Sequence, residues 1–380
     1  PMGEGRAQGN GLGRGSVVEV RSESPGGEGV QGVVLGSGAT EVAVLLPSMR
    51  QVRAARERLV ACGEALPRAE IERRLAALGP DAVDQLARLW AGTSVSAPSP
   101  VRHAARSFLK LATERWAVQQ WQQLMRDADR VDLLEEGGLV VSQWAEPGSA
   151  HAKDVRAFLA EIADAAAASI SLNAPVKDRV AVVSKVLFDD YGFSGNVDNY
   201  YDARNSFLHS VLQRRRGIPI SLSIVWTVVA RRLHIPCFLC TDMPAHILIR
   251  VRCGETLRDD LYVDAFGRKV MDFDGLRAFL RGIGIGQFAE EWTEQRPATF
   301  VYLRLLRNLK NIFQEEASTL TLDMMDLSPL ENLAATCSQM LTLARGDLAN
   351  SRESQMLTVV REQANVALAT HRSKNFTLTE

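Results

Sequence analysis

One stretch of the chain, residues 205–264, constrains the fold more than any other. It contains an apolar run at 218–230 and then two short apolar runs, of which one begins at His246 and the other ends at Asp264. The long run predicts a buried helix, and the short runs, rich in β-branched and aromatic residues, predict strands. We therefore expect a domain of the α+β class in which a histidine and an aspartate stand at strand ends.

The composition is that of an ordinary globular protein, because 46% of the 380 residues are hydrophobic and 23% are charged. A net charge of −1 predicts no general attraction to nucleic acid or to an acidic membrane surface. The most apolar run, 218–230, is shorter than the roughly 20 residues that a membrane span needs. Five scattered cysteines indicate a reducing compartment rather than a disulfide framework. We expect a soluble intracellular protein of the cytoplasm or of an organelle stroma, which would be the chloroplast stroma if a transit peptide has been removed.

Three patterns follow one another in the first 130 residues. Residues 1–15 are rich in glycine and predict a disordered arm. Residues 16–60 hold short β-rich runs separated by glycine clusters, which predict a small SH3-like β-barrel. Four arginines between positions 50 and 58 could give this barrel an RNA-binding rim, although a solvated helix face explains them as well. Residues 61–130 carry apolar side chains at helical spacing and predict helices.

The rest of the chain is mainly helical. Apolar periodicity predicts helices at 155–170, 178–188, 276–283, 300–316, 329–343 and 354–369. The last three lie at a spacing of roughly 30 residues, which is typical of a tetratricopeptide-like helical array. We expect such an array over residues 296–380, where it would offer a surface to a protein partner.

Residues 131–316 closely resemble the SirB-type family of transglutaminase-like proteins. The resemblance rests on the sequences YGFSGNVDNYYDARNSFL, RRRGIPISL, PAHILIR and YVDAF, which follow one another between positions 191 and 266. Ala245 replaces the usual glycine and Ala265 replaces the usual proline, and both changes affect turn geometry. The resemblance implies a papain-like core at 131–295 that leads into the helical C-terminal segment. A similar module occurs in an animal F-box protein.

The resemblance also assigns roles to single residues. In an active transglutaminase-like site, a thiol at the N-terminus of a helix is activated by a histidine that an aspartate orients. The resemblance places His246 and Asp264 in the last two roles. Counted back along the helix from Pro236, it places Pro219 at the position of the thiol. Proline has no nucleophilic atom, although it suits the first turn of a helix.

Three interpretations of this incomplete site remain open. In the first, the fold is retained for binding, and the protein is a non-catalytic adaptor or accessory factor that holds a protein partner. In the second, Ser221 takes the place of the thiol beside His246 and Asp264, which would make a hydrolase or acyltransferase acting on an amide or ester. Serine at a helix start is equally explained as a residue that hydrogen-bonds the backbone there. In the third, the site carries some other activity.

Basic and polar residues next to this site form a second candidate set. Arg215 and Arg216 stand at a predicted helix end, where their charge is favourable, and they could also bind an anion such as the carboxylate of a peptide. Arg204 and Asn205 lie in the polar segment before that helix and complete the set of cleft or anion-binding candidates. Hydrogen bonds that fix the loop to the core explain these two residues as well.

Cys237 and Cys240 form a lone CxxC sequence. On a strand, a separation of three residues directs the two side chains to opposite faces of the sheet. A zinc site would also need a second pair of ligands. Two buried thiols are therefore the favoured interpretation, and we expect neither a metal nor a cofactor.

Overall fold

The computed structural model describes residues 17–20, 30–37, 41–45, 51–55, 59–61, 100–126, 133–147, 150–171, 173–320, 327–344 and 351–377. The glycine-rich arm at 1–15 and much of the helical segment at 61–130 lie outside these residues. The chain divides into two compact units, residues 1–116 with 147–149 and residues 117–146 with 150–380. Among the residues described, no helix combines the length and the hydropathy that a membrane crossing requires.

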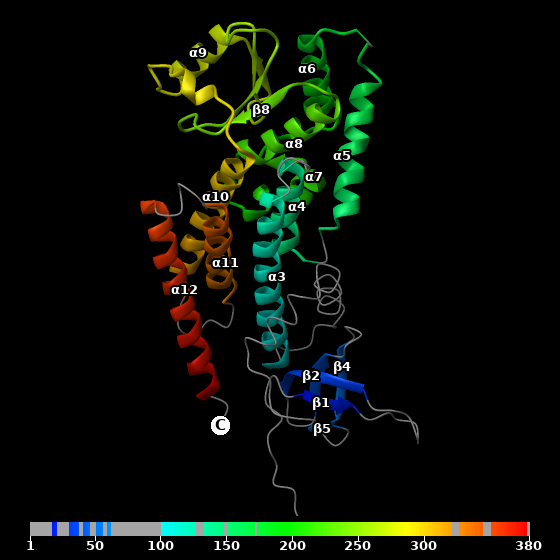
Figure 1. Cartoon of the computed structure of the whole chain (residues 1–380), viewed down its shortest axis with the longest axis vertical. Coiled ribbons are helices and arrows are strands. Elements are labelled where there is room, and N and C mark those ends of the chain that lie inside the picture. Colours follow the sequence, from blue (N-terminus) through cyan, green and yellow to red (C-terminus); the bar gives the residue numbers. More distant parts are fainter. Residues whose placement is uncertain are drawn as a thin grey trace, which may run out of the picture. The chain divides into compact units, whose positions relative to one another are not determined.

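The first unit contains an antiparallel sheet with the strand order β4-β3-β2-β1-β5 (Figure 1). Its strands are β1 (Val17–Val20), β2 (Val30–Ser37), β3 (Glu41–Leu45), β4 (Gln51–Ala55) and β5 (Leu59–Ala61). These strands lie on the β-rich runs of the sequence, whereas the closed SH3-like barrel stays a prediction. The RNA-binding rim rests on side chains outside the described part of the chain and stays a prediction too.

Helices form most of the second unit. Helix α3 (Pro100–Arg126) spans the boundary between the two units. The helices that follow are α4 (Leu133–Ala145), α5 (Ala152–Ala167), α6 (Val176–Lys185) with its π-helical extension η2 (Val186–Asp190), the short η3 (Ala203–Ser206) and α7 (Leu208–Arg214). A two-stranded parallel pair joins β6 (Ser194–Gly195) to β7 (Arg216–Gly217), which holds the segment before η3 against the segment after α7.

Helix α8 (Pro219–Arg232) is the buried helix that the apolar run predicts. Pro219 occupies its first turn, where a missing backbone N–H costs nothing. Every residue from 220 to 230 is buried, so the helix is covered on all sides. The helix ends at two arginines, and His234 beyond them adopts a left-handed backbone conformation with φ of 56°.

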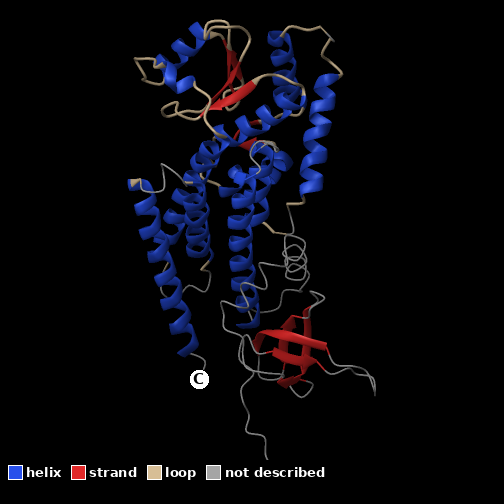
Figure 2. Cartoon of the chain, in the orientation of Figure 1, coloured by secondary structure: helices blue, strands red, loops and turns tan. Residues whose placement is uncertain are grey.

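A four-stranded antiparallel sheet of order β11-β10-β9-β8 packs against α8 (Figure 2). Its strands are β8 (Cys237–Cys240), β9 (Leu248–Val251), β10 (Leu261–Asp264) and β11 (Lys269–Met271). Val263 of β10 lies opposite Ile249 of β9. Because these strands are antiparallel, the start of β9 and the end of β10 share one edge of the sheet.

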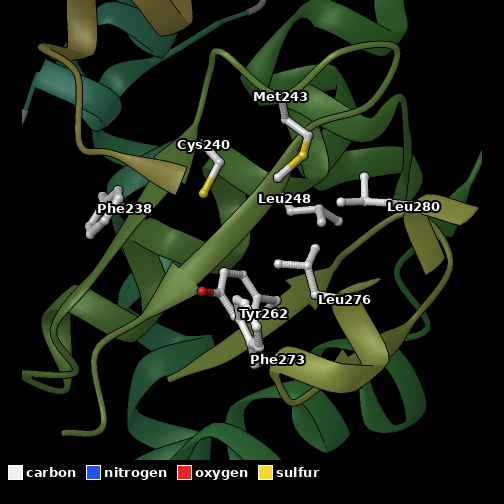
Figure 3. Close-up of a cluster of buried hydrophobic side chains, with 8 residues drawn as sticks. All are labelled: Phe238, Cys240, Met243, Leu248, Tyr262, Phe273, Leu276 and Leu280. Atoms are coloured by element: carbon white, nitrogen blue, oxygen red, sulfur yellow. The ribbon is translucent and has the colours of Figure 1, made fainter. Parts of the chain in front are cut away.

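The face of the sheet that is turned away from α8 is covered by α9 (Phe273–Gly282). Asp272 caps α9 by accepting a hydrogen bond from the Gly275 N–H at 2.8 Å. Figure 3 shows the apolar cluster that joins helix and sheet, which consists of Phe238, Cys240, Met243, Leu248, Tyr262, Phe273, Leu276 and Leu280. Burial of these side chains holds the strands on which the candidate site stands.

After the short 3-10 helix η4 (Glu290–Thr293), three further helices of the described residues pack in sequence (Figure 1). They are α10 (Ala298–Ser318), α11 (Ser328–Leu343) and α12 (Arg352–Thr377). Helix α11 packs against α10, and α12 packs against α11. This arrangement agrees with the predicted helices, while the assignment to a tetratricopeptide-like array stays a prediction.

Helix α10 is fixed to α4 through a tyrosine. The Tyr302 hydroxyl donates a hydrogen bond to the Leu134 carbonyl oxygen, and its ring lies 5.0 Å from the Trp121 ring. Gly137 makes this approach feasible, because a Cβ atom at that position would come within 2.7 Å of the tyrosine ring carbon Cζ. This attachment of α10 to α4 matters for function because α10 also carries Arg304, which contacts the candidate site.

Candidate functional site

The structure brings His246 and Asp264 together. His246 lies two residues before β9, and Asp264 is the last residue of β10, so both stand at the shared edge of the sheet. His246 Nε2 lies 3.1 Å from Asp264 Oδ1. The histidine side chain is 17% exposed and the aspartate side chain 5%. Because Nε2 faces the carboxylate, the other ring nitrogen, Nδ1, is the one left for a further partner.

Asp264 is held by main-chain donors as well. Its Oδ1 atom accepts hydrogen bonds from the backbone N–H groups of Phe266 at 3.1 Å and Gly267 at 2.9 Å. Burial alone would raise the pKa of Asp264, but the hydrogen bonds from His246 and from these two N–H groups outweigh it and lower the pKa below its ordinary value. The carboxylate is therefore ionised at neutral pH and can orient the imidazole.

This lowered pKa predicts a pH dependence of stability. A carboxylate whose pKa is lower in the folded state contributes stability above its unfolded pKa and loses that contribution as the pH falls through the folded pKa. We expect Asp264→Asn to be less stable than the wild-type chain at pH 5, and the difference to narrow toward pH 3. Urea denaturation at both pH values measures it, and a constant difference would contradict the assignment.

The turn that carries His246 is held by Arg304 of α10. The guanidinium donates hydrogen bonds to three carbonyl oxygens, those of Thr241 (2.8 Å), Met243 (3.0 Å) and His246 (2.7 Å). Ala245, within this turn, has φ of 59°, a left-handed conformation that glycine adopts without strain. The observation accounts for the glycine that the resemblance leads one to expect at this position.

Pro219 and Ser221 both lie in the first turn of α8. The Ser221 hydroxyl donates to the carbonyl oxygen of Asn205 at 2.6 Å and accepts from the backbone N–H of Ile218 at 3.1 Å. Its side chain is buried. Ser221 and His246 are not hydrogen-bonded to each other in the described structure; each has the partners named here. The serine therefore fixes the start of the helix to the preceding loop.

A chain of contacts links the His246–Asp264 pair to the start of α8. Phe266, two residues after Asp264, packs its ring on the backbone of Gly195, where an added Cβ atom would lie only 2.5 Å from the ring. Gly195 pairs with Gly217 in the β6–β7 ladder, and Gly217 stands two residues before Pro219. The parts that the resemblance assigns to one site are thus connected through Phe266 and Gly195.

Asn205 and Arg204, two of the polar candidates, differ in burial. Asn205 is fully buried, and its side-chain amide donates to the carbonyl oxygens of Asn199 at 2.7 Å and Tyr200 at 3.1 Å. Arg204 is exposed and forms an ion pair with Asp202 at 2.8 Å. These contacts hold both residues within the loop, and their anion-binding role stays a prediction.

Arg215 and Arg216 both have exposed side chains. The Arg215 guanidinium lies 5.8 Å from the centre of the Tyr191 ring, and its backbone is left-handed with φ of 57° at the end of α7. Arg216 makes a long hydrogen bond of 3.5 Å to the carbonyl oxygen of Gly195. Neither guanidinium has a carboxylate partner in the part of the chain that the structure describes, so the anion-binding role of this set stays a prediction.

The cysteines of the described part are free thiols. Cys237 faces α8, where its sulfur lies 3.9 Å from the Thr227 carbonyl oxygen, and Cys240 lies in the apolar cluster beneath α9. This confirms that the CxxC pair consists of buried side chains on opposite faces of the sheet. Burial raises the pKa of the Cys240 thiol to about 12 and raises that of Cys253 as well. No group of three or more potential metal ligands occurs among the described residues.

Two residues of the site were not identified from the sequence, Arg304 and Phe266. Arg304 lies 58 positions from His246, and no local pattern distinguishes an arginine that binds distant carbonyl groups from a solvated one. Phe266 belongs to the YVDAF sequence, but its partner Gly195 is equally distant in the chain. Contacts of this range depend on the assembled fold.

Comparison with protein families agrees with this architecture. Residues 153–307 match the model of the transglutaminase-like superfamily, and this part of the chain is accordingly a transglutaminase-like domain. No solved structure matches the chain.

The similar curated proteins include two kinds. A UPF0162 protein of Xylella fastidiosa is 36% identical over 141 residues, covering 36% of this chain and 49% of the relative. A UPF0162 protein of Vibrio cholerae is 28% identical over 161 residues, covering 41% of this chain and 56% of the relative. F-box only protein 21 of Mus musculus is 42% identical over 105 residues, covering 26% of this chain and 16% of that protein. The chain thus spans about half the length of the bacterial relatives it matches.

Proposed function

We propose that the transglutaminase-like domain of this chain is a non-catalytic module that binds a protein partner. The observation that carries the proposal is the first turn of α8, where Pro219 stands at the position that the SirB-type resemblance assigns to the thiol. A proline at this position gives His246 no nucleophile to activate. The histidine and its aspartate then remain as parts of the folded surface.

The hydrogen bonds of Ser221 favour this proposal over a serine hydrolase. A hydroxyl has one proton, and both acceptors within reach of the Ser221 hydroxyl are carbonyl oxygens, that of Asn205 at 2.6 Å and that of Ile218 at 3.1 Å. To attack a substrate, the serine would have to give up the bond that it donates and the bond from the Ile218 N–H, and each buried group left unpaired costs about 1–3 kcal/mol. The amide- or ester-processing enzyme with Ser221, His246 and Asp264 is the alternative, and it requires this rearrangement.

Among the described residues, the cysteine thiols offer no better candidate for a catalytic nucleophile than Ser221. The nucleophile in cysteine catalysis is the thiolate, and Cys240, with a pKa raised to about 12 by burial, stays protonated at neutral pH. The likeness to F-box only proteins supports a role in protein interaction.

A fluorophosphonate probe tests the proposal against the serine alternative. We expect the wild-type chain to remain unlabelled, since the Ser221 hydroxyl is buried and bonded to the main chain. Labelling that disappears in Ser221→Ala and in His246→Ala would overturn the non-catalytic assignment. Denaturation curves of both variants show whether a loss of labelling reflects loss of the fold.

A second experiment tests the position of the missing thiol. In Pro219→Cys the new thiol would stand at a helix N-terminus, which lowers a thiol pKa. We expect iodoacetamide to alkylate it at pH 7 about tenfold faster than Cys253, whose pKa is raised. Peptide mass spectrometry compares the two sites within one sample, and adding His246→Ala should slow only the new site. Equal rates at the two sites would contradict the placement of position 219.

A further inference from the structure

The loop between β6 and η3 exposes apolar side chains beside the His246–Asp264 pair. In the described part of the chain, eight large apolar side chains are exposed, and three of them, Val197, Tyr200 and Tyr201, fall within five residues of this loop. Val197 is 74% exposed and Tyr201 is 78% exposed. Single exposed apolar residues are ordinary, but a group of them with aromatic members marks a binding surface more often.

These aromatic rings are attached to the site and to each other. The Tyr200 ring lies 5.3 Å from that of Tyr201 and 6.2 Å from that of Phe266, in both cases edge to face. Phe266 follows Asp264 by two residues, and its backbone N–H binds the Asp264 carboxylate. The exposed tyrosines therefore continue the surface on which the His246–Asp264 pair stands.

The loop backbone is fixed before any partner arrives. The buried Asn205 amide binds the carbonyl oxygens of Asn199 and Tyr200, and its own oxygen accepts a hydrogen bond from the Asn196 side chain at 2.9 Å. The Asp202 N–H donates to the Asn199 carbonyl oxygen at 3.3 Å. Tyrosines held on a fixed backbone lose little conformational entropy on binding, which favours affinity.

Two arginines border this surface, and one of them, Arg216, has no carboxylate partner in the described part of the chain. Arg216 bonds only the Gly195 carbonyl oxygen, and Gly195 contacts Phe266. Arg304 bonds three carbonyl oxygens, and both Tyr200 and the Asp242 carboxylate lie near its guanidinium. Of the two carboxylates in the loop, Asp198 is exposed, while Asp202 is already paired with Arg204. A peptide with a carboxylate and an apolar side chain complements this set.

We infer that the tyrosine loop, defined as residues 196–202 with Phe266, binds an acidic peptide segment of a protein partner, with Arg216 and Arg304 facing its carboxylates. The inference rests on the proposed binding function and specifies the chemistry of the partner. A peptide suits this surface better than RNA, because the chain's net charge of −1 gives no general attraction to a phosphate backbone. Apolar contact to the tyrosines supplies affinity, and the arginines supply selection by charge.

Fluorescence anisotropy with two labelled peptide mixtures tests the inference on the full chain. One mixture carries Asp and Glu among Leu and Phe, and the other carries Lys and Arg in place of the acids. We expect the acidic mixture to bind and the basic mixture to bind at least about tenfold more weakly. A labelled oligouridine is the third probe, and preferential binding of this RNA would overturn the inference.

Variants locate the binding surface. Tyr201→Ala and Val197→Ser should each weaken binding of the acidic mixture, the tyrosine change by about tenfold or more. Arg216→Gln should weaken it by several fold and reduce its salt dependence. Val270→Ser, which changes an apolar residue on β11 that is 41% exposed, is the matched control and should bind as the wild type does. Equal binding by wild type and Tyr201→Ala would overturn the inference.

The same samples separate this inference from the proposed function. Mass spectrometry of the acidic peptides after incubation shows whether any of them has been cleaved or acylated. Peptides that bind through Tyr201 and remain unchanged support both conclusions. Peptides that bind through Tyr201 and are converted would overturn the non-catalytic assignment and leave the binding surface in place. Unchanged peptides with binding that does not depend on Tyr201 would overturn the binding surface alone.

Discussion

The Asp260→Ala variant is expected to lose about 3–5 kcal/mol of unfolding free energy, because it leaves a buried charge without its partner. Arg250 Nε lies 2.6 Å from Asp260 Oδ2, and the carboxylate is almost fully buried. Its second oxygen accepts the Cys253 N–H at 2.9 Å. Removing the carboxylate therefore takes away the ionic partner of the guanidinium, which keeps only its bond to the Thr293 carbonyl oxygen at 3.1 Å, and leaves the Cys253 N–H unpaired.

Urea denaturation of the wild type and of Asp260→Ala measures this loss. Asp259→Ala is the matched control, since the neighbouring carboxylate is exposed and accepts hydrogen bonds from Thr256 and Glu255, which are close by in the chain; its effect should be far smaller. The double variant Arg250→Met with Asp260→Leu should recover much of the stability, because it removes the charge as well as its partner. Similar losses in Asp259→Ala and Asp260→Ala would contradict the importance of the buried pair.

The sequence alone does not distinguish these two aspartates. They are adjacent in RDDLYVD, and only the pairing of β9 with β10 buries one and exposes the other. Local patterns were sufficient for α8, whose apolar run at 218–230 became a helix at Pro219–Arg232. They were also sufficient for Asp264, the last residue of β10, whereas β9 begins at Leu248, two residues after the predicted start at His246. What local patterns do not supply is the pairing of strands that are distant in the chain, which decides which of two adjacent side chains is buried.

Helix boundaries show the same difference between local and distant causes. The helix predicted at 276–283 begins at Phe273, because Asp272 caps it, and the sequence DFDG contains that local signal. The partners of Arg304, in contrast, could not be inferred from any neighbouring residue. Ser221 is intermediate: a backbone-bonding role was one of two interpretations, and the structure shows which carbonyl oxygen it binds.

The Asn205→Ala variant is expected to lose about 3 kcal/mol of unfolding free energy, because several buried partners of one amide become unpaired at once. The amide binds two carbonyl oxygens, and its oxygen also accepts a hydrogen bond from Arg214 at 3.2 Å. An anion-binding residue on the surface would behave differently, since its replacement by alanine would leave stability unchanged. Urea denaturation therefore distinguishes the structural role of Asn205 from the binding role.

Asn199→Ala is the matched control, because Asn199 lies in the same loop with an exposed side chain and its replacement should change stability by less than about 0.5 kcal/mol.

The same two variants also test whether the tyrosine loop must be fixed before it binds a partner. If Asn205 fixes that loop for a partner, Asn205→Ala should weaken binding of the acidic peptides under conditions where the chain is still folded, since the entropy of ordering the loop must then be overcome on binding. Asn199→Ala should bind as the wild type does. Unchanged binding by a folded Asn205→Ala chain would show that the tyrosines need no fixed backbone.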